Sequence, residues 1–198
     1  MLPTEMDIKQ FRQVVNFVTP LEEAVMDDFQ AIFRLQLVEK GENFISEGEI
    51  AGHVAFVCNG LLRSYYISPK GEEFNKHFFL EGTFLAPLTS LVLKIPSPLY
   101  IGTLETTRIL IAEFADLESL YDKHLILNKL ARKLTEFAWI GKEKRETQLI
   151  MLSATDRYQA FLEEYPGLES RIPQYHIASY LGITPVQLSR IRASLNIG

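Results

Sequence analysis

Apolar residues close to the start of the chain recur at helical spacing. In residues 20–33, PLEEAVMDDFQAIF, they are separated by four, four and three positions, and Pro20 stands near the beginning. Side chains at this spacing share one face of a helix. The pattern predicts a short amphipathic helix.

From Arg34 to about Glu113 the pattern changes to short alternating or β-rich runs. These runs are RLQLV, HVAFVC, LLRSYYI, EFNKHFF, LYIGTL and RILIAEF. Turn residues separate them; in Ser68–Gly71, Pro stands second and Gly fourth, as a type I turn favours. Short strands with turn signals and no helices between them predict a β jelly roll, or double-stranded β-helix.

Helical spacing returns after Ala115. From about Asp116 to Ser153 there is no Pro and one Gly, Gly141, which predicts a long central helix. Four residues of this segment step by three, four and three, as in a heptad seam of about two repeats. They are Leu127, Leu130, Leu134 and Phe137. Such a seam packs either on its own domain or on a second copy of the chain, and the spacing leaves both open.

The chain closes with three shorter helical segments. ATDRYQAFLEEYPGL predicts a helix that stops at Pro166-Gly167, and Pro173 keeps the next residues extended. Gln174–Leu181 and Pro185 to about Leu195 are then two further helices. Only three residues separate them, which predicts a helix-turn-helix.

The residues at this turn each favour the same geometry. Gly182 suits the left-handed conformation that ends a helix. Thr184 suits an N-cap, Pro185 suits the first helical position, and Gln187 completes a capping box with Thr184.

The outer face of the second helix carries the candidate chemistry. The last acidic residue is Glu169, so phosphates would meet no like charge here. Arg190 points away from the apolar side and suits a guanine edge, whereas Arg192, nearer the core, suits a phosphate. The predicted DNA-binding residues are Thr184, Val186, Gln187, Ser189, Arg190 and Arg192. The alternative is a helical hairpin that only packs.

Composition restricts the remaining functions. The 198 residues carry a formal net charge of -5, so any nucleic-acid contact must be local. A single cysteine, Cys58, excludes an intrachain disulfide or an iron–sulfur site and suits a reducing cytoplasm. We expect neither a secretory signal nor a membrane span, and no metal or other cofactor.

The order of these segments resembles the CRP/FNR family of bacterial transcription regulators. The resemblance rests mainly on IASYLGITPVQLSRIRASL, and then on GLLRSYYISPKGEEFNKHFFLEGTFL. It implies an α+β protein with a sensor jelly roll over 1–115, a dimerising helix over 116–153 and a winged helix-turn-helix over 154–198. It also implies a homodimer on double-stranded DNA, an unknown small-molecule effector, and RNA polymerase as a further partner.

Two departures from the family pattern change the expected ligands. Pro185 and Val186 replace the first two base-contacting residues, so the family's usual operator is not expected. In the sensor segment Ala86-Pro87 stands where the family has Gly-Glu, and Ser97-Pro98 stands approximately where it has Arg-Ser or Arg-Ala, whose Arg binds the phosphate. Lys94 cannot form the bidentate fork of an arginine, so we predict no binding of cyclic AMP in the family's way.

The effector pocket would then involve Ala86, Pro87, Leu88, Ser97 and Tyr100. It either takes a more apolar ligand or is filled by the protein's own side chains. The filling side chains would be Leu88, Leu91, Val92 and Tyr100.

Two other functions stay open. A jelly-roll metalloenzyme would need several histidines close in sequence, whereas His53, His77, His124 and His176 are scattered. A protein-interaction adaptor would fit the last 45 residues, where four arginines and four acidic residues cancel. Salt dependence separates the adaptor from a DNA reader, because phosphate contacts weaken steeply with salt.

Overall fold

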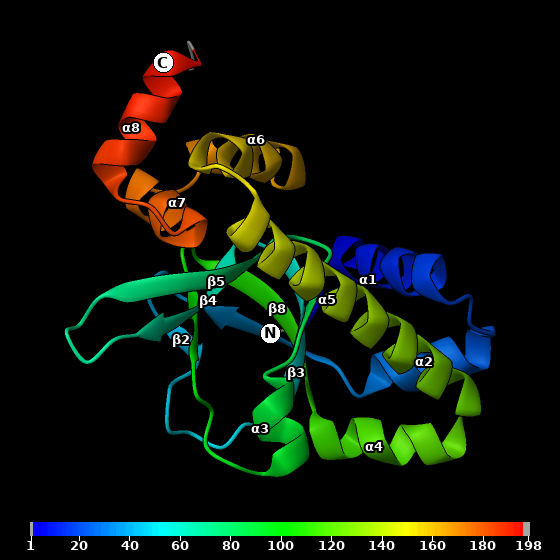
Figure 1. Cartoon of the computed structure of the whole chain (residues 1–198). Helices are drawn as coiled ribbons and strands as arrows, with labels where there is room; N and C mark the ends of the chain where they lie inside the picture. The colour runs from blue at the N-terminus through cyan, green and yellow to red at the C-terminus, as the bar shows by residue number, and fades with distance from the viewer. Residues whose placement is uncertain (1, 196–198) are drawn as a thin grey trace. The chain divides into compact units, whose positions relative to one another are not determined.

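A computed structural model describes residues 2–195 (Figure 1). The chain divides into two compact units. The first holds residues up to Ser64 together with Phe78–Phe137, and the second holds Tyr65–His77 together with the residues from Ala138 onward. Each unit is made of two separate stretches of chain, whereas the sequence suggested three consecutive segments, 1–115, 116–153 and 154–198. The functions assigned to those three segments stay predictions. The expected α+β fold class is confirmed.

Two helices open the first unit. The helix α2 (Glu23–Ala31) is the one expected within 20–33. The preceding helix, α1 (Glu5–Val18), was not expected. Its signals are present in the sequence: Thr4 and Asp7 form a capping box, and Phe11 and the valines behind it make a buried face.

Two four-stranded sheets form the jelly roll. One has the strand order β1-β8-β3-β6 and the other β2-β7-β4-β5. All six expected strands are present: β1 (Arg34–Val38), β3 (His53–Asn59), β4 (Leu62–Ile67), β5 (Glu73–Phe79), β7 (Tyr100–Thr103) and β8 (Thr107–Glu113). Two further short strands were not predicted from the sequence: β2 (Asn43–Ile45) and β6 (Phe84–Leu85). The central pairing is antiparallel, with Val54 opposite Ala112 and Phe56 opposite Leu110.

The jelly roll contains a helix that the sequence did not indicate. Residues Leu88–Leu93 form α3, where we expected no helix between strands. Its six residues are too few for a clear 3.6-residue period. The core of the first unit gathers around Phe11, whose ring centroid lies 5.3 Å from that of Phe56 in an edge-on arrangement.

The single central helix expected over 116–153 is two helices, α4 (Phe114–Lys123) and α5 (Leu125–Met151). The break falls at His124, whose backbone is extended. Its imidazole Nε2 lies 2.7 Å from a carboxylate oxygen of Asp28 on α2. This tertiary contact fixes the break at a residue that propensity alone does not mark.

The first residues of the predicted dimer seam pack within their own unit. Leu127 and Leu130 are fully buried in the core of the first unit, and Leu134 packs against that core. They therefore face their own domain, which is the first of the two alternatives that the heptad spacing left open. Phe137, by contrast, is 56% exposed.

The second unit combines the tip of the β4–β5 hairpin with the second half of α5 and three further helices: α6 (Ala154–Glu164), α7 (Gln174–Leu181) and α8 (Pro185–Ser194) (Figure 1). A 3-10 turn, η1 (Leu168–Ser170), follows α6. The expected turn at Ser68–Gly71 is confirmed by a 2.9 Å bond from the Gly71 N–H to the Ser68 carbonyl.

The wing is the one part of the expected fold that the described residues do not contain. Between residues 154 and 195 the regular elements are all helical. Separately, none of the helices within residues 2–195 is long and apolar enough to span a bilayer.

Candidate nucleic-acid interface

The turn between α7 and α8 has the expected left-handed Gly182 and the Thr184 cap, but of the two bonds of the predicted capping box the structure shows only the one from the Gln187 N–H to Thr184. Gly182 adopts the left-handed conformation, with φ 69° and ψ 36°, and the Ile183 N–H bonds to the Ala178 carbonyl at 3.0 Å. The Thr184 hydroxyl accepts from the Gln187 N–H at 3.2 Å, and Pro185 follows at the first helical position. These bonds fix the direction in which α8 leaves α7.

The second helix of the pair has a buried and an exposed side. Leu188 is fully buried and Ile191 nearly so, both against their own unit. Five of the six predicted DNA-binding residues are exposed: Thr184, Val186, Gln187, Ser189 and Arg190. The structure therefore brings these five onto one accessible side of the turn and α8.

The sixth residue, Arg192, is half-buried, and its Nε is buried without a hydrogen-bond partner. The Arg192 cation interacts electrostatically with Tyr158 of α6. The Tyr158 hydroxyl donates a hydrogen bond to Glu169 at 2.7 Å. Burial and the bond to Glu169 raise the pKa of Tyr158 to about 12, and the Arg192 cation opposes this rise. Arg192 thus faces its own unit, and its assignment to a DNA phosphate stays a prediction.

Two arginines outside the helix pair hold the end of α7. Arg145 of α5 lies over the Tyr180 ring, 4.0 Å from its centroid, and donates to the Tyr180 carbonyl. Arg157 of α6 donates to the Leu181 carbonyl at 3.0 Å. The last carbonyls of a helix have no partner within it, so these guanidinium groups satisfy them. Arg145 and Tyr180 are 35 residues apart, so no local sequence signal indicates this contact.

The β4–β5 hairpin also contacts α7. Asn75 of β5 is buried, and its side-chain amide donates to the His176 carbonyl at 2.9 Å. Ser179 of α7 bonds to the backbone of the same strand. Sequence reasoning placed this hairpin wholly in the sensor domain, and no local signal marks its attachment to a segment about a hundred residues later.

The residues proposed for an effector pocket do not form one enclosed site. Ala86 and Leu88 are exposed, Pro87 and Ser97 are buried, and Tyr100 is half-buried. The Ser97 hydroxyl donates to the Leu99 carbonyl at 2.8 Å, so an internal bond already occupies it.

The expected filling of the pocket is also only partly correct. Leu91 is fully buried, but Leu88 and Val92 are 46% and 58% exposed. A hollow of about 440 Å³ does lie in this region, and Pro87 is the member of the predicted set that lines it, beside Ile45 and His53. The Nε2 of His53 lies 2.8 Å from a carboxylate oxygen of Glu113.

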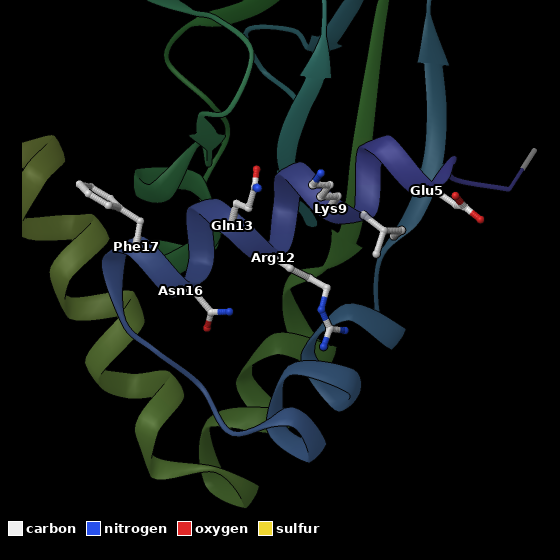
Figure 2. A pocket seen from close by; sticks show the side chains of 7 residues that line it. Glu5, Lys9, Arg12, Gln13, Asn16 and Phe17 are labelled. Atoms are coloured by element: carbon white, nitrogen blue, oxygen red, sulfur yellow. The ribbon is translucent and has the colours of Figure 1, made fainter.

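A second hollow, of about 660 Å³, lies along α1 (Figure 2). All seven lining residues, from Glu5 to Phe17, belong to this one helix. Figure 2 shows their side chains spread along its outer side, with Arg12 extended away from the helix axis. Arg12 pairs with Glu23 and Asp27 of α2, so its charge is already matched. A surface lined by one helix does not enclose a ligand, and we assign none.

The described histidine, acidic and cysteine side chains are scattered, and the thiol is buried. Within residues 2–195, groups of three or more His, Cys, Asp or Glu side chains suited to a metal ion are absent. Cys58 is buried, and burial raises the pKa of its thiol to about 12. A thiol in this state is a poor nucleophile.

Comparison with known proteins gives no match among family models or curated sequences. Solved structures do match. FixK2 from Bradyrhizobium japonicum superposes with a TM-score of 0.73 at 22% identity, covering 83% of this chain and 85% of its own. The c-di-GMP responsive global regulator CLP of Xanthomonas campestris gives 0.70 at 15% identity, covering 88% and 92%.

A third structure extends the comparison. A transcriptional regulator of the CRP/FNR family from Eubacterium rectale gives a TM-score of 0.69 at 18% identity, covering 89% of this chain and 84% of its own. Each match spans more than four fifths of both chains. At these identities the likeness concerns the fold, and the chain has the fold of the CRP/FNR transcription regulators.

Proposed function

We propose that the protein is a homodimeric transcription regulator that reads DNA with α8. The observation that carries this proposal is the exposed, acid-free side of α8, held on a capped turn with Leu188 and Ile191 buried behind it. A helix presented in this way fits the major groove, where side chains reach base edges. The similarity of fold to regulators such as FixK2 supports the same function.

Base recognition would centre on Arg190. It is exposed on α8, and a guanidinium can bind the O6 and N7 of guanine with two hydrogen bonds. Val186, 62% exposed, offers an apolar contact such as a thymine methyl group accepts. Thr184 and Gln187, at the start of the helix, lie where phosphate and flanking contacts are made.

The dimer would form along the second half of α5 in place of the buried leucines. Apolar side chains are exposed there, and large exposed apolar patches mark interaction sites. One face of this segment continues the heptad from Phe137 in steps of three, four, three and four. Its residues are Phe137, Ile140, Lys144, Thr147 and Met151. In a dimer these faces would meet and set the separation of the two reading helices.

The experiment that tests this function is selection from a random DNA pool by the full-length protein. We expect a palindromic site with half-sites about one helical turn apart. Arg190→Ala should lose preference at one position in each half-site and bind about 10- to 100-fold more weakly to the selected site, since one good bidentate contact contributes about 1–3 kcal/mol.

Arg190→Lys is the matched control, because lysine keeps the charge but not the planar fork. It should lose the guanine preference while the dependence of affinity on salt stays near that of the unchanged protein. If the unchanged protein enriches no sequence, α8 is not a DNA reader and the adaptor function takes its place.

The sensor unit is proposed not to bind cyclic AMP in the family's manner. The sequence has no arginine between Arg63 and Arg108. Pro87 is buried, and the Ser97 hydroxyl already donates to the Leu99 carbonyl. Titration calorimetry with cyclic AMP should give no measurable heat at micromolar protein. Tight binding would show that other N–H donors replace the missing fork.

A further inference from the structure

The strand β5 lies at the edge of its sheet and bonds to α7. It stands at the end of the strand order β2-β7-β4-β5, and an edge strand has a row of N–H and C=O groups without strand partners. Ser179 of α7 meets two of them. Its hydroxyl accepts from the Asn75 N–H at 2.9 Å and donates to the Glu73 carbonyl at 2.7 Å. A single hydroxyl therefore joins this edge to α7.

The side chain of Asn75 makes a second connection at the same place. Its amide Nδ2 donates to the His176 carbonyl at 2.9 Å and lies 3.3 Å from the His176 Nδ1. Asn75 and His176 are 7% and 3% exposed. A buried amide or imidazole that loses its partner is strongly disfavoured, so these bonds restrict where α7 can lie against the strand. We call Glu73, Asn75, His176 and Ser179 the hairpin clasp.

The other end of α7 is held by a different element. Arg145 of α5 stacks on Tyr180 and donates to its carbonyl. The first helix of the pair is thus fixed between α5, which carries the proposed dimer face, and the β4–β5 hairpin. Since α7 sets the direction of α8 through the capped turn, both attachments act on the reading helix.

We propose that Asn75 and Ser179 are positioning residues for DNA reading. Through the hairpin clasp, the β4–β5 hairpin fixes the orientation of the reading head, without either residue lying on the exposed side of α8. The inference rests on the proposed DNA-binding function and goes beyond it. It adds, within the second unit, an attachment of the helix-turn-helix to the β4–β5 hairpin that is separate from α5.

The test compares variants of the full-length protein on a DNA library. The library keeps the selected half-site and varies the number of base pairs between its two copies. Ser179→Ala removes the hydroxyl and Ser179→Thr retains it, which makes a matched pair. Asn75→Ala removes the buried amide, and Lys76→Ala alters an exposed neighbour on the same strand.

We expect Ser179→Ala and Asn75→Ala to keep the base preferences within each half-site but to accept a wider range of separations. Their affinity for the best separation should fall roughly tenfold, the factor for losing one or two hydrogen bonds. Ser179→Thr and Lys76→Ala should match the unchanged protein. Unchanged affinity and unchanged separation in Ser179→Ala would overturn the proposal, and so would tighter binding, which would mean that the clasp holds the head away from DNA.

Amide hydrogen exchange without DNA separates this inference from the function on which it rests. In Ser179→Ala, residues 73–77 and 174–181 should exchange faster together, while Ser179→Thr should preserve their protection. Unchanged exchange would show that the clasp does not restrain α7. If exchange rises as expected but the unchanged protein selects no DNA, the clasp exists and the DNA-reading role is wrong. If Asn75→Ala does not fold, the Ser179 pair alone decides.

Discussion

Individual polar residues at helix ends determine much of the local geometry in this protein. Thr184 begins α8 with its hydroxyl, and Gly182 ends α7 in the left-handed conformation. At the other end of the chain, Asp7 accepts from the Thr4 N–H at 2.8 Å and from its hydroxyl at 2.7 Å. Asp7 also pairs with Arg108 of β8, so one carboxylate both caps α1 and ties it to the sheet.

The Asp7 carboxylate predicts a dependence of stability on pH. Burial opposes its ionisation, but the hydrogen bonds from Thr4 and the Arg108 cation prevail and lower its pKa. A carboxyl whose pKa is lower in the folded state stabilises it above the unfolded pKa, near 4, and loses this effect as pH falls further. Asp7→Asn should cost about 1–3 kcal/mol at pH 6, because it leaves Arg108 without its partner.

Urea unfolding at pH 6 and pH 3 checks this expectation. The difference in unfolding free energy between Asp7→Asn and the unchanged protein should shrink at the lower pH. Glu5→Gln, at an exposed acid in the same first turn, is the control and should show little change. An equal cost of Asp7→Asn at both values would mean that the carboxyl acts by packing and not by its charge.

The limits of helices and strands could be predicted where residues close in sequence determine them. The limits of α7, and the start of α8, follow from Pro, Gly and Thr at fixed offsets, and the strand β1 has the limits that its alternating run indicates. By contrast, β2 and β6 have three and two residues, too few to show a period. The helix α1, by contrast, has a capping box at Thr4 and an apolar face, so its signals are local and present in the sequence.

The helix α5 shows why a heptad alone does not reveal a partner. Apolar residues at heptad spacing only require burial, and the surface that buries them lies elsewhere in the chain. Leu127 and Leu130 contribute to the jelly-roll core, whereas Ile140 and Met151 are 59% and 74% exposed on the same helix. The contacts of Asn75 and Arg145 with α7 were unpredictable for the same reason, since their partners lie 101 and 35 residues away.

At the scale of the whole molecule, the boundary between the two units cuts three continuous elements. It passes between Ser64 and Tyr65 in β4, between His77 and Phe78 in β5, and between Phe137 and Ala138 in α5. A change in the jelly roll would therefore reach the second unit through two strands as well as a helix. A ligand shifts such an equilibrium only by its difference in affinity between the two states.

The position of the dimer face gives a prediction for the assembly. Ile140→Asp places a charge where two copies of the exposed face of α5 would meet, and the charge would be repeated by symmetry. The variant should be monomeric by light scattering at concentrations where the unchanged protein is a dimer. Thr135→Asp, an equal change of charge at an exposed position on another side of the same helix, should stay dimeric.

Leu127→Ala distinguishes this face from the seam that the heptad spacing first indicated. Leu127 is fully buried in the first unit, so its truncation should lower the unfolding free energy by about 2–5 kcal/mol. The folded variant should nevertheless remain a dimer, because Leu127 does not reach the exposed face. A monomeric Leu127→Ala beside a dimeric Ile140→Asp would return the interface to the N-terminal half of α5. The opposite result would place it beyond Phe137, where the heptad continues on exposed residues.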